Sequence, residues 1–256
     1  MDPWGIKVTT PIEIIYASDV SATVRTLQNE ALAAAANEWG NYGPLEYWVN
    51  GTDATAAKEL AAQFCTRWLV RANFNDVDDC LTNHYVGRFL SQMSEGAGLN
   101  GDRNAGIHLL GSQLPRGFGG LSPAPYAEDQ VLAFHEYFHV VQHSHIFTRD
   151  WNERNELLGS VWFNEGGAEF MAQTVTQRLR ESGDLTASTW ESLVERMTWK
   201  MRDVTDWMTS NTGQKSEKFH TAQIRTLPTA MGPGLMLGYP MSMERTPCCS
   251  TRFTRH

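Results

Sequence analysis

The sequence has no long hydrophobic run, no excess of basic residues and no paired-cysteine motif, and each absence argues against a class of protein. No stretch approaches the roughly 18 to 20 uninterrupted apolar residues that a membrane-spanning helix needs. The formal net charge of -8 argues against nucleic acid as a partner, because a phosphate backbone selects for a basic surface. The lack of a CxxC pair argues against a zinc site built from thiolates.

The first residues, Met1 to Lys7, also lack the basic segment and apolar core of a secretory signal. The sequence therefore does not decide the cellular compartment. Either the protein is intracellular, or the sequence begins after a processing site and the protein is secreted or periplasmic. Hydrophobic residues make up 41% of the chain and charged residues 20%, which is typical of a soluble globular protein. A chain of 256 residues can bury a substantial core, as one large domain or two closely joined lobes.

Two of the four cysteines, Cys65 and Cys80, are close enough in sequence to close a short loop. A disulfide between them would stabilise the fold by about 3 kcal/mol in an oxidising compartment. Two buried free thiols explain the same residues equally well, so the sequence leaves both interpretations open.

Hydrophobic periodicity predicts a mixture of strands and helices first and helices alone afterwards. Strands are predicted over 11–16, 45–49 and 105–110, helices over 19–38, 53–72 and 80–95, a loop over 111–125, and further helices over 126–146, 161–181 and 187–209. This order is typical of an α+β fold. We therefore expect residues 1–125 to form an N-terminal mixed sheet with helices, and residues 126–219 to form a helical lobe.

The segment 220–256 follows neither periodicity and is rich in Pro, Gly, Met, Thr and Arg. It is interpreted either as a disordered tail or as the product of a slipped reading frame. Codons for Pro228 to Gly238, read from the third base of each, permit Y-G-Y-G-T-W-A-H-A-W, which looks like the start of a packed helix. No functional inference depends on this segment.

The strongest local motif is HEYFH, in which His135 and His139 lie four residues apart within a predicted helix. Residues at this spacing share one helix face, so both imidazoles can reach one ion. Imidazole and carboxylate ligands suit zinc better than magnesium or calcium, which prefer oxygen shells. Three protein ligands leave one position of zinc open for water. Glu136, next to the first ligand, would then lie near that water as a general base.

A second motif, N-E-G-G-A-E, places Glu165 and Glu169 on one face of a later helix. Glu165 is placed to be a third ligand, and Glu169 can accept the N–H of a ligating histidine and so fix its tautomer. Gly166 and Gly167 each cost a helix about 1 kcal/mol relative to alanine, which a close approach to the HEYFH helix would explain. Large apolar residues surround the two carboxylates in sequence, and carboxylates in such surroundings usually have a partner; these residues are Trp162, Phe163, Phe170 and Met171.

Together, HEYFH and NEGGAE resemble the gluzincin metallopeptidases, the thermolysin-like group, whose HExxH motif is followed by a glutamate ligand on a second helix. The resemblance covers about 105–180 and is specific over 134–143 and 162–171. It implies a zinc ion held by His135, His139 and Glu165, and Glu136 as the base. Gln142 is familiar from HExxHxxQ variants of the motif.

The resemblance also implies roles for residues around the ligands. Asn164 and Glu169 would lie just outside the three ligands, with Glu169 orienting a ligand histidine. The strand near 105–110 would be the edge of the sheet, against which an extended peptide substrate pairs. No G-x-M-E-N is present, which disfavours the aminopeptidase branch and favours an endopeptidase. The family's donor to the reaction intermediate is not assigned, and Tyr126, His143 and His145 are candidates.

Three alternative interpretations fit parts of the sequence. A metzincin would read HExxHxxGxxH, and His145 stands at the third histidine position, but Gln142 replaces the glycine that turns the chain. In a continuous helix His145 would point about 120° away from His139. A di-iron carboxylate bundle needs two Glu-x-x-His copies, and only Glu136 to His139 supplies one. The third alternative is a catalytically inactive, metal-binding protein with a peptidase-like fold.

Overall fold

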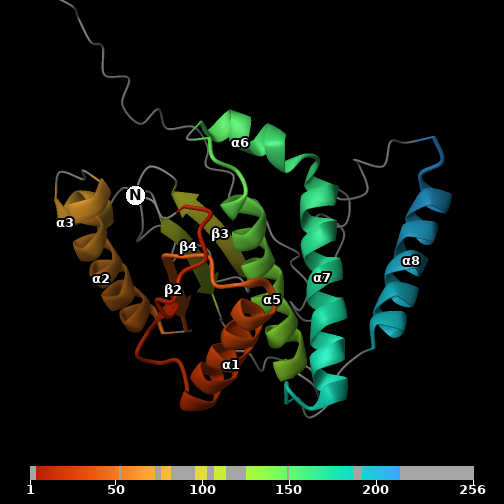
Figure 1. Ribbon diagram of the computed structural model, residues 1–256, viewed down its shortest axis with the longest axis horizontal. Coiled ribbons are helices and arrows are strands. Elements are labelled where there is room, and N and C mark those ends of the chain that lie inside the picture. Colours follow the sequence, from red (N-terminus) through yellow and green to blue (C-terminus); the bar gives the residue numbers. More distant parts are fainter. Residues whose placement is uncertain are drawn as a thin grey trace, which may run out of the picture.

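The computed structural model describes residues 4–51, 53–72, 76–81, 96–102, 107–113, 125–148, 150–186 and 192–213. The elements are, in chain order, β1 (Glu13–Tyr16), α1 (Ala22–Trp39), β2 (Leu45–Asn50), α2 (Ala54–Ala72), α3 (Val77–Asp79), β3 (Gly96–Asp102), β4 (Ile107–Gln113), α5 (Pro125–Ser144), α6 (Trp151–Leu158), α7 (Val161–Ser182) and α8 (Leu193–Ser210). The fold is α+β, as predicted, with the strands in the first half and helices alone in the second (Figure 1). Part of the helix predicted over 80–95 and the whole segment 220–256 lie outside the described residues.

The sheet is mixed and has the strand order β1-β2-β4-β3. β1 and β4 both run parallel to β2, whereas β3 runs antiparallel to β4. The strand predicted over 105–110 is β4, described from Ile107 onward, and three residues predicted as loop, 111–113, belong to it. Its expected position at the sheet edge is wrong, because β4 pairs with β2 on one side and β3 on the other. The glycine-rich β3, which the sequence did not reveal, forms that edge.

Alternate residues of β2 connect the sheet to helices on its two faces. Trp48 packs edge-on against Phe64 of α2, with ring centroids 5.0 Å apart. Glu46, on the same side of the strand, lies 3.0 Å from the Arg67 Nε of α2. Tyr47, between them in sequence, faces the opposite side of the sheet and is fully buried. In Figure 1, α1 and α5 lie on the other side of the sheet from α2. The sheet is therefore sandwiched between α2 and the α1–α5 pair.

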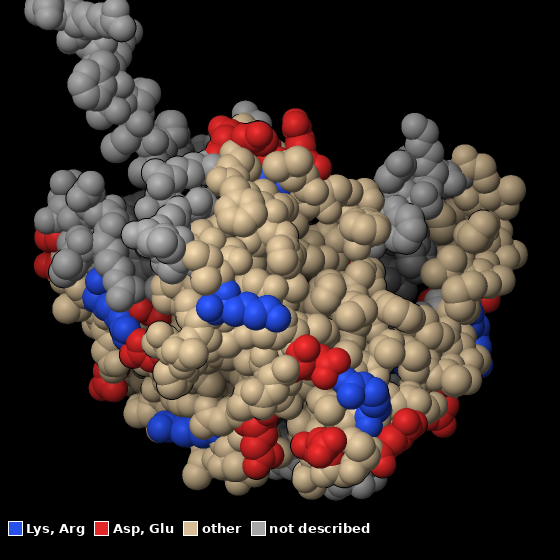
Figure 2. Space-filling view, in the orientation of Figure 1, with Lys and Arg blue, Asp and Glu red and all other residues tan. Residues whose placement is uncertain are grey.

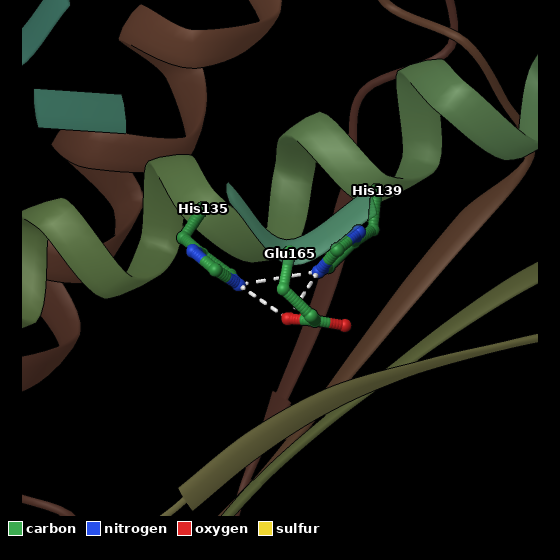
Figure 3. Close-up of side chains that lie close together, drawn as sticks. All are labelled: His135, His139 and Glu165. Atoms are coloured by element: carbon green, nitrogen blue, oxygen red, sulfur yellow. Dashed lines mark hydrogen bonds and ion pairs between the residues drawn. The ribbon is translucent and has the colours of Figure 1, made fainter. Parts of the chain in front are cut away.

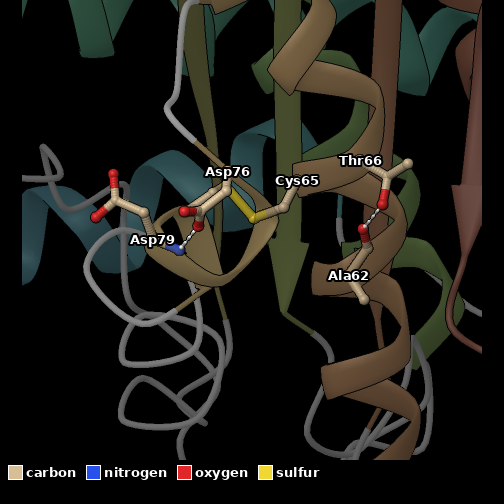
Figure 4. Close-up of a disulfide and its surroundings, with 6 residues drawn as sticks. Ala62, Cys65, Thr66, Asp76 and Asp79 are labelled. Carbon is tan, nitrogen blue, oxygen red and sulfur yellow. Dashed lines mark hydrogen bonds between the residues drawn. A yellow bond between two sulfur atoms is a disulfide. The ribbon is translucent and has the colours of Figure 1, made fainter.

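A disulfide joins Cys65 of α2 to Cys80, directly after α3 (Figure 4). Their Cα atoms are 5.7 Å apart and both residues are fully buried. Of the two interpretations left open by the sequence, the structure contains the bridge. It fastens the short α3 turn, which begins with the Asp76 carboxylate accepting the Asp79 N–H at 2.7 Å, to a long helix.

The helix that carries the HEYFH motif, α5, is anchored to the first half of the chain. The Trp39 ring, at the end of α1, contacts the rings of Phe134, Tyr137 and Phe138, with centroids 5.7, 6.4 and 5.1 Å away. The buried Tyr137 hydroxyl donates to the Gly40 carbonyl at 2.8 Å and accepts the Tyr42 N–H at 3.3 Å. These contacts fix the position of α5 along and around its axis.

The remaining helices extend the helical side of the molecule away from the sheet. α7 packs against α5, and α8 follows beyond α7 (Figure 1). α8 begins with a capping box, in which Ser192 and Glu195 satisfy each other's backbone N–H groups. Residues 187–191, the start of the helix predicted over 187–209, lie outside the described residues.

Charged side chains are scattered over the face shown in Figure 2. Acidic side chains gather at the top of this view, over α6, and basic ones stand singly among acidic ones elsewhere. Within the described ranges, none of the helices combines the length and hydrophobicity needed to cross a membrane.

Candidate metal centre

Two neighbouring helices bring His135, His139 and Glu165 together (Figure 3). The two histidines lie one turn apart on α5, and Glu165 lies in the first turns of α7. The two Nε2 atoms are 3.1 Å apart. The Glu165 Oε2 lies 3.2 Å from the His135 Nε2 and 3.3 Å from the His139 Nε2. The side chains thus converge through one atom each, as the sequence predicted.

The spacing of these three atoms fits a small tetrahedral ion. Ligands about 2.0 to 2.1 Å from tetrahedral zinc lie about 3.3 Å from one another. Two of the three distances match this spacing and the third is slightly shorter. Two imidazole lone pairs and a carboxylate oxygen cannot all face each other at this distance without positive charge between them. Protons or a cation must supply it.

The pKa values of the same residues show this need for positive charge between the three side chains. Burial lowers the pKa of the His135 imidazole, but hydrogen bonds with Glu165 and Glu169 raise it more, and the pKa is about 10. Burial raises the pKa of Glu165, but hydrogen bonds from the two imidazoles outweigh it and bring the pKa to about 2. Burial likewise lowers the pKa of His139, but the hydrogen bond with Glu165 raises it, and the net shift of this pKa is upward. A bound cation would replace the protons that the imidazoles otherwise hold.

The candidate base, Glu136, is enclosed beside the histidines. Glu136 is 1% exposed, and its Oε2 has no hydrogen-bond partner within the described part of the chain. Burial raises the pKa of this carboxyl group, although the neighbouring His135 and His139 oppose the shift. A buried carboxylate oxygen without a partner is costly to the fold.

Glu169 lies behind His135, on the side away from the ligand atoms. Its Oε2 is 3.5 Å from the His135 Nδ1. Its Oε1 lies 3.4 Å from the Arg196 guanidinium of α8 and 3.3 Å from the Gln173 amide. Neither Arg196 nor Gln173 was singled out in the sequence. No motif in the sequence around Arg196 indicates a role at the site, because only the packing of α8 against α7 brings this side chain there.

The expected apolar surroundings of the carboxylates are only partly correct. Phe163 and Phe170 are 67% and 53% exposed, so polar partners rather than these rings hold Glu169. Gly167 does not permit a closer helix contact than alanine would, because an added Cβ would lie 3.6 Å from the nearest atom, the Gln142 Nε2. Gly166 is exposed. The explanation offered for the two glycines is therefore wrong.

Asn164 contributes through its backbone rather than its side chain. Its carbonyl accepts a hydrogen bond from the Gln142 Nε2 at 3.1 Å. Its side-chain Oδ1 is buried without a hydrogen-bond partner among the described residues. The polar side chain that lies against His139 is that of Gln142, whose Oε1 is 2.7 Å from the His139 Nδ1.

The other candidate residues do not join the cluster. α5 ends at Ser144, and the exposed His145 packs its ring edge-on against Tyr42, with centroids 5.4 Å apart. His145 is therefore not placed as a third ligand. His143 is buried in the last turn of α5, outside the ligand group. Tyr126 lies in the first turn of α5, where the side chains are outside the description.

No known protein family, curated protein or solved structure matches the chain. What the structure establishes is a candidate metal-binding triad, His135, His139 and Glu165, on two packed helices of an α+β fold.

Proposed function

We propose that this protein is a zinc-dependent metallopeptidase that hydrolyses internal peptide bonds. The observation that carries the proposal is the convergence of the His135 Nε2, the His139 Nε2 and the Glu165 Oε2 at the spacing of tetrahedral zinc ligands. The gluzincin resemblance of the two motifs supports the choice of zinc and of peptide hydrolysis. The donor set of two imidazoles and one carboxylate also favours zinc over oxygen-preferring ions.

Zinc held by these side chains would lower the pKa of a water molecule and polarise a substrate carbonyl. Glu136 takes one proton from the water through its unpartnered Oε2. As the water oxygen bonds to the carbonyl carbon and the C–N bond breaks, Glu136 passes this proton to the leaving amine. Burial favours this role because a carboxylate with a raised pKa is a better base.

The sheet offers a place for an extended peptide. β3 hydrogen-bonds to β4 on one side, and among the described strands no partner covers its other edge. β3 also packs beside α5, the helix that carries both histidine ligands. A substrate that paired with β3 as an added strand would therefore run past the metal centre. This edge replaces β4 as the proposed substrate strand.

The test compares Glu136→Ala and Glu136→Gln with wild type in cleavage of a fluorescent casein substrate. Glu59, exposed on α2, provides the matched control Glu59→Ala. We expect both Glu136 variants to retain zinc and to lose activity by roughly 10²- to 10⁴-fold, the usual contribution of a general base. Equal cleavage by wild type and the Glu136 variants would refute the role of Glu136. Zinc binding without cleavage by wild type would favour the second candidate, an inactive metal-binding protein.

A second pair of variants tests the ligand set. Glu165→Ala should lower bound zinc well below one ion per chain, because one of three converging ligands is removed. His145→Ala should leave the zinc content at its wild-type value. The opposite pattern would support a metzincin-like site and contradict the glutamate ligand.

A further inference from the structure

Gln142 connects the two helices of the metal centre at a single side chain. It lies on α5, one turn after His139, and is partly buried. One end of its amide, Oε1, is 2.7 Å from the His139 Nδ1. The other end, Nε2, donates to the backbone carbonyl of Asn164 at 3.1 Å. Asn164 directly precedes the ligand Glu165 on α7.

The chemistry of these partners allows the amide only one orientation. A backbone carbonyl can accept but cannot donate a hydrogen bond, so the NH₂ group of Gln142 must face Asn164. The Oε1 atom, which can only accept, then faces His139. The His139 Nδ1 must therefore carry a proton and donate it. The hydrogen bond made by one ring nitrogen determines which nitrogen is left for a metal.

The consequence is an imidazole whose Nε2 is reserved for the ion. The His139 Nε2 is the atom that lies 3.3 Å from the Glu165 Oε2 and 3.1 Å from the His135 Nε2. The same amide holds the backbone of α7 next to Glu165, so one side chain positions ligands from both helices. His135 has a different support, since its Nδ1 faces Glu169.

We propose that Gln142 is a positioning residue of the metal centre: it holds a proton on the Nδ1 of His139, so that Nε2 is the nitrogen left for the ion, and it sets the distance between the helix of His139 and the helix of Glu165. The inference rests on the proposed zinc site and deepens it, but the hydrogen bond itself exists without an ion. It can therefore be tested separately from metal binding and from peptide cleavage.

The experiment uses the full chain labelled with ¹⁵N-histidine and three variants. Gln142→Leu removes both hydrogen bonds while keeping a side chain of similar size. Gln142→Glu keeps an acceptor for the His139 Nδ1–H, but when ionised cannot donate to Asn164. Gln28→Leu is the matched control, because Gln28 of α1 is a fully buried glutamine whose amide has no hydrogen-bond partner among the described residues.

In metal-free protein, we expect a slowly exchanging Nδ1–H signal of His139 that disappears in Gln142→Leu, shifts but persists in Gln142→Glu and is unchanged in Gln28→Leu. In chelator competition, Gln142→Leu should bind zinc about 10- to 100-fold more weakly than wild type, as found when outer partners of metal-binding histidines are removed. Gln142→Glu should lose less affinity, and Gln28→Leu none.

A Gln142→Leu protein that keeps the Nδ1–H signal, or that loses it with zinc affinity unchanged, would overturn the proposal. If Gln142→Leu does not fold, Gln142→Glu decides: an Nδ1–H signal identical to that of wild type, with unchanged affinity, contradicts the role of the amide. Wild type that shows the Nδ1–H signal and binds zinc but cleaves no peptide would refute the proposed function and leave the role of Gln142 intact.

Discussion

Zinc binding should release protons, and the structure sets how many. In the metal-free protein the pKa of His135 is about 10, so this imidazole is charged at neutral pH. The pKa of His139 is also raised. Glu165, with a pKa of about 2, is already ionised and has no proton to lose. Because histidine binds a metal only when its ligand nitrogen is deprotonated, we expect between one and two imidazole protons to leave per ion at pH 7.

The size of the effect on affinity follows directly. Each proton released makes the apparent affinity rise tenfold per pH unit, or about 1.4 kcal/mol. From pH 6.5 to pH 8 the affinity should therefore rise about 30-fold if one proton leaves, and more if two do. Two histidines with the ordinary pKa of 6.5 would be almost fully deprotonated by pH 8, and the affinity would reach a plateau below that pH.

Isothermal titration calorimetry in buffers with different protonation enthalpies counts the protons. Titration with Cd²⁺, which acidifies a bound water less than Zn²⁺ does, separates protons lost by the imidazoles from any lost by water. His145→Ala is the control and should release the same number, since His145 lies outside the ligand group. Binding without proton release at pH 7, together with an affinity that is flat from pH 7 to pH 8, would refute the reasoning.

Three further predictions concern stability. Gly167→Ala should raise the free energy of unfolding by about 0.5 to 1 kcal/mol, seen as a higher melting temperature. Among the described residues, the added methyl group would meet only the Gln142 Nε2, at 3.6 Å. A lower melting temperature would contradict the described packing. Reduction of the bridge between Cys65 and Cys80 should lower the free energy of unfolding by about 3 kcal/mol in denaturant titrations, and an unchanged midpoint would mean that the bridge is not closed in solution. The charged form of His135 stabilises the metal-free fold fully below its unfolded pKa of 6.5, and this contribution is lost as the pH rises through about 10; chelated protein that melts at the same temperature at pH 7 and pH 10 would exclude it.

Part of the candidate metal site could be predicted from sequence because it depends on local helix geometry. His135 and His139 share a helix face by their spacing alone, whatever the rest of the fold does. The pairing of this face with Glu165 was inferred from the NEGGAE motif and from the gluzincin resemblance, and the contact between α5 and α7 agrees with it. The disulfide, by contrast, cannot be decided from the sequence, since a distance between two cysteines in sequence does not give their distance in space.

The elements that the sequence missed depend on tertiary contacts. β3 contains three glycines and no β-branched or aromatic residue, so nothing in its own sequence favours a strand. Only the pairing with β4 makes this segment a strand. The same pairing makes β3 the edge of the sheet, a position that the sequence wrongly assigned to β4. α6 is short and has little hydrophobic periodicity, and only the Asp150 cap, whose carboxylate accepts the Glu153 N–H, marks its start. Likewise, the contact between Arg196 and Glu169 requires α8 to be in place.

The anchoring of α5 has a consequence for how the protein can be divided. Tyr137 lies between the two candidate metal-binding histidines in sequence, and its hydroxyl group bridges the Gly40 carbonyl and the Tyr42 N–H, while Trp39 packs against the same helix. The ring of a residue inside the HEYFH motif is thus held by the segment that joins the first helix to the second strand. A fragment that began near residue 126 would keep every proposed ligand but would lose the contacts that hold the helix of His135 and His139 in position. We therefore expect the metal centre to form only when both halves of the chain are present.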